Sequence, residues 1–215
     1  MMKKRKSMKQ MLLFFLIIVL LSGCANQVEL KQEDVDSMPP VNQDGFIVIK
    51  VPKTLLGGYT AEELEAEDIA SRENHNKEDM SNSAWSALVA NEDGTISYYF
   101  TPEQYQETKD IFYDLGRLRD AQNGEFMYSF VESAEYMDID ANGIPWGLVV
   151  SVNKDTYLSF ELWNSALATV TPAIMLGRYQ ILCGVSDDEW SVHVVVRDAA
   201  NGDIIEETDF PTRDK

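Results

Sequence analysis

Hydrophobic and polar positions divide the chain into three parts. Residues 11–21 form an unbroken apolar run that follows a basic start. Residues 25–45 are polar and acidic, contain Pro39-Pro40 and have no period, a pattern typical of a flexible tether. From residue 46 onward, apolar positions recur with the spacing of strands and helices, which predicts a folded domain over residues 46–210 and a tail over 211–215.

Alternating or β-rich runs predict the strands of this domain. In the run 190–197, for example, Val192, Val194 and Val196 share one face and His193 lies on the other. Glycine-containing turns predict three hairpins, about residues 91–94, 140–143 and 201–202. The expected strands cover residues 46–51, 85–90, 95–100, 134–139, 146–152, 190–197 and 203–210.

Three segments have helical features. Thr60 and Glu63 have capping-box spacing and open a predicted helix over 60–73, and Thr101 and Gln104 do the same for a helix over 102–122. Residues 157–183 are apolar nearly all round, which favours a helix buried against a sheet over one that spans lipid. The expectation is one α+β domain: an antiparallel sheet of six or seven strands, built from hairpins and packed with about three helices.

Charge narrows the range of partners. The chain has 36 acidic and 18 basic residues, a formal net charge of −18. Such a surface repels nucleic acid and anionic lipid head groups, so no nucleic-acid partner is expected. It keeps a tethered module in solution, where we expect a monomer, and it attracts cations or basic partners.

The tetrad Leu21-Ser22-Gly23-Cys24, placed after a basic start and an apolar run, resembles the lipobox of bacterial lipoproteins. The resemblance implies that residues 1–23 are a signal peptide, that Cys24 becomes the diacylated N-terminus, and that residues 24–45 tether the domain. The protein would then lie on the outer face of the bacterial cytoplasmic membrane, anchored there by palmitate-type lipid. An uncleaved membrane helix and an ordinary secreted protein are the alternatives.

A second resemblance covers residues 46–120 and, more weakly, 185–207. The run Ile49-Lys50-Val51-Pro52 and the hairpin at residues 91–101 are similar to those of small lipoproteins from Gram-positive anaerobes. That family has no assigned activity, so the resemblance implies a fold and a location only.

One local motif points to a metal. Asp138, Asp140 and Asn142 are followed by Gly143, which is how a calcium-binding loop starts. Position 12 of such a loop is Val149, where a bidentate glutamate belongs, and the same residues also predict a plain hairpin turn. These three residues are therefore candidate ligands of calcium, and no other cofactor is expected.

Other chemistry has few candidates. The two histidines, His75 and His193, lack the spacing of zinc ligands, and Cys183 lies in an apolar run typical of a buried thiol. No nucleophile elbow, P-loop or dinucleotide motif occurs. The sequence thus favours a lipid-anchored, non-enzymatic envelope module that binds a protein, a peptide or a glycan. The alternative is an extracytoplasmic glycan hydrolase that uses paired carboxylates; a solute-binding protein is a poorer third, because it needs two lobes.

Overall fold

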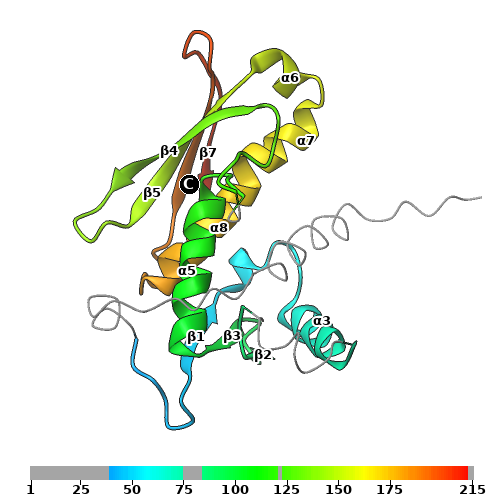
Figure 1. Ribbon diagram of the computed structural model, residues 1–215, viewed down its shortest axis with the longest axis vertical. Helices are drawn as coiled ribbons and strands as arrows, with labels where there is room; N and C mark the ends of the chain where they lie inside the picture. The colour runs from blue at the N-terminus through cyan, green and yellow to red at the C-terminus, as the bar shows by residue number, and fades with distance from the viewer. Residues whose placement is uncertain (1–38, 75–83, 121–122, 213–215) are drawn as a thin grey trace, which may run out of the picture. The chain divides into compact units, whose positions relative to one another are not determined.

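The computed structural model describes residues 39–74, 84–120 and 123–212 (Figure 1). These residues form two compact units, divided between Thr108 and Lys109 inside helix α5 (Pro102–Gly116). Each unit has its own β-sheet.

The first unit is built on a three-stranded antiparallel sheet with the order β1-β3-β2. Alternation along the strands buries Ile47, Ile49 and Val51 and leaves Val48 and Lys50 exposed. Helix α3 packs against β2. The elements are β1 (Ile47–Val51), the short 3-10 helix η1 (Lys53–Leu55), α3 (Ala61–Asn74), β2 (Ala87–Ala90) and β3 (Ile96–Phe100).

Both predicted capping boxes are confirmed. The backbone N–H of Thr60 donates to Glu63 Oε2 at 2.9 Å, and that of Glu63 donates to Thr60 Oγ1 at 3.2 Å. At the start of α5, Thr101 and Gln104 exchange the same pair of bonds at 3.0 and 3.2 Å. Each box satisfies donors that a helix leaves unpaired at its first turn, which is why these two helices begin where the sequence predicts.

The second unit contains a four-stranded sheet with the order β4-β5-β6-β7. Its strands are β4 (Val131–Ile139), β5 (Pro145–Val152), β6 (Val192–Asp198) and β7 (Ile204–Phe210). A run of helical segments connects β5 to β6: α6 (Lys154–Leu158), α7 (Glu161–Ser165), the π-helical turn η2 (Ala166–Val170) and α8 (Thr171–Leu182). Helix α8 and η2 cover the face of the sheet on which Leu148, Val150 and Val194 are fully buried (Figure 1).

The mixed class of helices and strands is confirmed, but the prediction of one antiparallel sheet is wrong in two respects. The strands belong to two sheets, because β3 has β1 and β2 on its two edges and β4 pairs with β5 alone. In addition, β5 and β6 are parallel. A long helical crossover joins these two strands, and such a connection permits parallel pairing where a hairpin cannot.

The predicted helix over 157–183 is broken into segments. Its C-terminal part is buried against the sheet, as expected, with Ala173 and Leu176 fully buried. Its N-terminal part starts earlier, at Lys154, and turns sharply between α6 and α7. In the part of the chain that the structure describes, no helix is long and apolar enough to cross a membrane.

Candidate interaction surface

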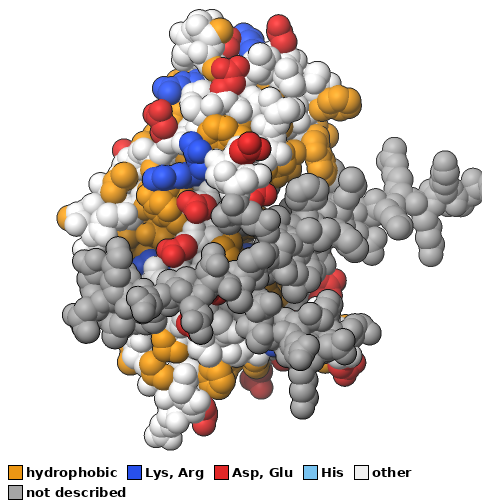
Figure 2. Space-filling model, in the orientation of Figure 1, with side chains coloured by type: hydrophobic (Ala, Val, Ile, Leu, Met, Phe, Trp, Pro, Cys, Tyr) orange, Lys and Arg blue, Asp and Glu red, His pale blue; other side chains and the backbone are white. Residues whose placement is uncertain are grey.

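Three large apolar side chains project from the turn between α6 and α7. Leu158, Phe160 and Leu162 are 41%, 73% and 83% exposed, and we refer to them together as the apolar corner. Figure 2 shows apolar side chains gathered at the upper right, in the region of α6 and α7. Single exposed leucines are ordinary, whereas several large apolar side chains together at one surface point to an interaction site.

Local hydrogen bonds determine the shape of this turn. Asn153 caps α6, with its side-chain oxygen accepting from the Thr156 N–H at 3.1 Å. The Phe160 carbonyl accepts from the N–H groups of Trp163 and Asn164, both at 2.9 Å, and so begins α7. The backbone is thereby held on both sides of Phe160.

Asn164 fastens the turn from inside. It is 7% exposed, and its Nδ2 donates to the carbonyls of Tyr157 at 2.8 Å and Thr156 at 3.2 Å. Those carbonyls lie at the end of α6, where a helix leaves acceptors unpaired. The inward contacts of the turn are therefore made by Tyr157 and Asn164, and the apolar corner is left facing solvent.

Glu206 on β7 attaches the turn to the sheet. The Tyr157 hydroxyl donates to Glu206 Oε2 at 2.7 Å, and the Ser165 hydroxyl donates to Oε1 at 2.9 Å. Tyr157 is 1% exposed, and its ring contacts that of Phe130 edge to face. Burial, and after it the hydrogen bond to Glu206, raises the pKa of Tyr157, so the hydroxyl keeps its proton and remains a donor.

Acidic groups outnumber basic ones near the apolar corner in the sequence. Asp155 and Glu161 are exposed within the same two helices. Lys154 is the one basic residue in α6 and α7. The surface thus combines exposed apolar groups with carboxylates.

The structure assigns the residues of the possible calcium loop to a hairpin turn. Asp140 Oδ1 accepts from the N–H groups of Asn142 at 2.8 Å and Ile144 at 2.9 Å. Asn142 Nδ2 lies 3.5 Å from Asp140 Oδ2, and Asp138 is an exposed residue of β4 outside this turn. The N–H of Ile144 is the main group that lowers the pKa of Asp140, with Asn142 and the Trp146 indole adding to it.

The same turn occurs elsewhere without any suggestion of a metal. Asn42 Oδ1 accepts from the N–H groups of Asp44 at 3.0 Å and Phe46 at 2.9 Å. In both turns a glycine follows with positive φ, Gly45 at 88° and Gly143 at 79°. Asn or Asp at the first position and Gly at the fourth are what this turn requires, so turn chemistry by itself accounts for these residues. The calcium site stays a prediction.

His193 lies half-exposed on the open face of the sheet, as its strand position predicts. Its Nδ1 is 2.7 Å from Asp209 Oδ1, and its Nε2 is 3.2 Å from Glu207 Oε1. No group of three His, Cys, Asp or Glu residues within the described ranges is arranged to hold a metal ion. His75 and the lipobox residue Cys24 lie outside the described residues.

The environment of Cys183 could not be predicted from its own segment, because its basic neighbour comes from another element. The positive charge of Lys109 on α5 lowers the pKa of the thiol, and its ammonium lies 6.0 Å from the ring centre of Tyr179. Burial nevertheless raises the pKa of Cys183, and Lys109 only partly opposes it. Since the thiolate is the reactive form, this environment suits a structural thiol better than a nucleophile.

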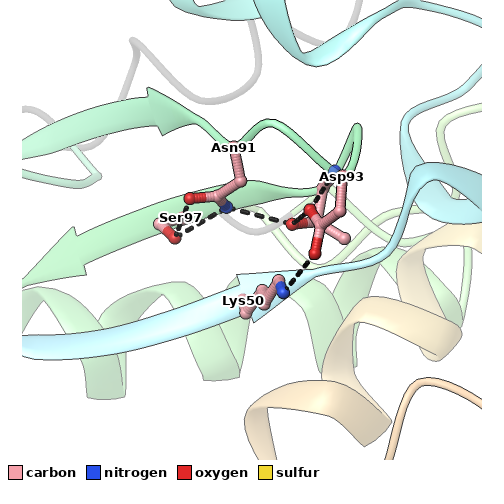
Figure 3. A network of polar contacts seen from close by, with 5 residues as sticks. Lys50, Asn91, Asp93 and Ser97 are labelled. Atoms are coloured by element: carbon pink, nitrogen blue, oxygen red, sulfur yellow. Dashed lines mark hydrogen bonds and ion pairs between the residues drawn. The ribbon is translucent and has the colours of Figure 1, made fainter.

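A polar network joins the β2–β3 turn to β1 in the first unit. Figure 3 shows Lys50 pointing toward Asp93, with Nζ 2.6 Å from Oδ2. Asn91 Nδ2 donates to the hydroxyls of Thr95 and Ser97, both at 3.0 Å. The bonds from Lys50 and Thr95 lower the pKa of Asp93 well below its ordinary range. The bond from Lys50 also fastens the hairpin turn to β1.

The glycan-hydrolase alternative depends on two carboxyls that face each other, one of them desolvated. Burial raises the pKa of Glu67, with Glu63 adding to it. These two residues are exposed on successive turns of α3, so they do not face each other across the space a substrate needs. This pair gives the hydrolase hypothesis no geometric support, and the hypothesis stays a prediction.

The apolar corner was also missed, because its residues fall inside the predicted buried helix. Asn153, followed three residues later by Thr156, was an available sign of a separate helix start. The exposure of Phe160 and Leu162 depends on the turn before α7, which periodicity does not reveal. Compared with known proteins, the chain matches no family model, no curated protein and no solved structure.

Proposed function

We propose that this protein is a lipid-anchored, extracytoplasmic binding module without enzymatic activity, and that the apolar corner is its binding surface. The observation that carries the proposal is the exposure of Phe160 and Leu162 on a turn fastened by Asn164 and Glu206. Exposing apolar side chains to water is unfavourable, and it is retained where a partner covers them.

The stability of the turn supports a binding role. Its side chains need little ordering when a partner arrives, because the backbone is already capped on both sides of Phe160. Binding to a preorganised surface loses less conformational entropy than binding to a mobile one. A buried tyrosine that holds its proton is suited to anchoring a turn and not to acid–base chemistry near neutral pH.

The lipid anchor rests on the tetrad Leu21-Ser22-Gly23-Cys24. We expect Cys24→Ser to abolish incorporation of radiolabelled palmitate and to leave an uncut precursor. Cys183→Ser is the matched control, since it removes the other cysteine of the chain, and it should incorporate as much label as the wild type. Equal labelling of the Cys24→Ser protein would refute lipidation.

The binding role is tested in the living cell with a photo-crosslinking amino acid at position 160. We expect discrete adducts that disappear when Leu162 is also changed to serine. The same amino acid at position 48, an exposed valine of β1, is the control and should not give these adducts. An absence of adducts at position 160 in cells that carry the full-length protein would argue against the apolar corner as the binding surface.

A further inference from the structure

We infer that the apolar corner binds a cationic amphipathic segment of another protein, one that pairs apolar side chains with lysine or arginine. This inference rests on the proposed binding function and specifies the class of partner. It follows from two properties of the same surface: exposed apolar groups, and carboxylates that lie between and beside them.

The apolar part supplies the contact. Phe160 and Leu162 are 73% and 83% exposed and are separated by a single residue at the start of α7. Aromatic and aliphatic side chains that project from a fixed backbone are typical anchors at the centre of protein interfaces. A partner must therefore present apolar side chains of its own to cover them.

The charged part selects the partner. Glu161 lies between the two anchors in the sequence, Asp155 lies in the preceding helix, and both are exposed. The carboxylate of Glu206 is already engaged by Tyr157 and Ser165, and Glu207 lies beside His193 on the opposite face of the sheet. Asp155 and Glu161 are therefore the exposed carboxylates of this surface. A partner with basic groups around its apolar side chains would complement these carboxylates, and opposite charges at a rim accelerate association and exclude wrong partners.

The same charges disfavour the other occupants of an exposed apolar surface. A second copy of this chain would bring Glu161 and Asp155 of one molecule toward those of the other, and the chain as a whole carries a net charge of −18. An anionic lipid surface would be repelled in the same way. A cationic segment is the partner class that gains from both the apolar and the acidic groups.

The test uses the full-length chain in nanodiscs of phosphatidylcholine, a lipid without net charge. The nanodisc holds the protein through its lipid if Cys24 is acylated, and through the apolar run 11–21 if that run is retained. The result therefore does not depend on lipidation. The probe is a fluorescein-labelled synthetic helix of leucine and lysine, and a helix of leucine and glutamate is its matched control. Fluorescence anisotropy measures the Kd of each peptide.

We expect the leucine–lysine helix to bind and the leucine–glutamate helix not to. The double change Phe160→Ser and Leu162→Ser should raise the Kd at least about tenfold, and Glu161→Gln should raise it roughly threefold, in line with a rim charge. The controls Val48→Ser and Glu132→Gln remove an exposed apolar group and an exposed acid from β1 and β4, and they should leave the Kd unchanged. Circular dichroism confirms that each variant is folded.

Four outcomes would overturn the inference. They are unchanged peptide binding in the double variant, equal binding of the leucine–glutamate helix, crosslinking between two copies through position 160, and a blue shift of a Phe160→Trp variant when phosphatidylglycerol enters the nanodisc. The last two would assign the apolar corner to a second copy or to lipid. The palmitate-labelling and cellular crosslinking experiments test the broader proposed function separately, so its failure can be told apart from the failure of this inference.

Discussion

At the scale of single residues, the best-defined electrostatic feature is the ion pair between Lys50 and Asp93. Hydrogen bonds from Lys50, and then from Thr95, lower the pKa of Asp93. A lowered pKa in the folded state means that the contribution of Asp93 to stability is present above its unfolded pKa. That contribution is lost as the pH falls toward the folded value.

We expect Lys50→Met to move the titration of Asp93 back toward the ordinary range of an aspartate, because its strongest donor is removed. NMR detection of the Asp93 carboxyl carbon during an acid titration measures this directly. Lys53→Met, which removes a nearby exposed lysine of η1, should leave the midpoint where it is in the wild type. The same midpoint in Lys50→Met and wild type would show that Lys50 is not the cause.

Asp140 gives a second prediction at this scale. Its carboxylate accepts two backbone N–H groups within its own turn. We therefore expect Asp140→Ala to lower the melting temperature by a few degrees, equally in a chelator and in millimolar calcium. If calcium stabilises the wild type but not Asp140→Ala, that difference would support the calcium loop predicted from Asp138, Asp140 and Asn142.

At the scale of elements, α5 and β4 approach each other closely at Gly116. A Cβ built there would lie 2.6 Å from the Tyr136 hydroxyl oxygen and 3.7 Å from Leu176 Cβ. Tyr136 is held in place by its hydrogen bond to the Tyr113 carbonyl and by the Arg117 guanidinium, whose carbon lies 4.6 Å from the ring centre. The glycine thus makes room for the hydroxyl that connects the helix to the strand.

We expect Gly116→Ala to destabilise the protein by about 1–3 kcal/mol through overpacking, although alanine is the better helix former by about 1 kcal/mol. In a Tyr136→Phe background the clashing oxygen is gone, so the same substitution should cost less or become favourable. Chemical denaturation of the four proteins of this cycle measures the coupling. Equal costs in both backgrounds would show that the Tyr136 hydroxyl is not what excludes a side chain at position 116.

At the scale of the whole molecule, the dominant property is a net charge of −18. Like charges on one surface repel each other and disfavour the compact state, and salt screens that repulsion. We expect the melting temperature to rise between low salt and about 0.5 M sodium chloride, a concentration at which the screening length falls to a few ångströms. Sucrose at equal osmolality is the control, and a melting temperature that stays flat or falls with salt would contradict the prediction.

Much of the local structure could be predicted because the signals are local. The two capping boxes place the starts of α3 and α5 through contacts three residues apart, and turn residues such as Asn91 and Asp140 place hairpins. The calcium prediction rests on the same kind of local pattern, with the residues taken as metal ligands instead of turn residues. A turn that needs Asp and Gly for its backbone and a loop that needs them for a metal share their first residues.

The sequence by itself determined the positions of the strands, the starts of two of the three predicted helices and the acidic character of the surface, since periodicity, caps and composition are properties of neighbouring residues. The end of the second helix was wrong, because α5 stops at Gly116 and not near residue 122. Only the tertiary structure decided how the strands divide into two sheets, that β5 and β6 are parallel, and that Phe160 and Leu162 face solvent. Pairing and exposure depend on residues far apart in the chain. The hydrogen bond from Tyr157 to Glu206 spans 49 positions, a separation over which no local pattern extends.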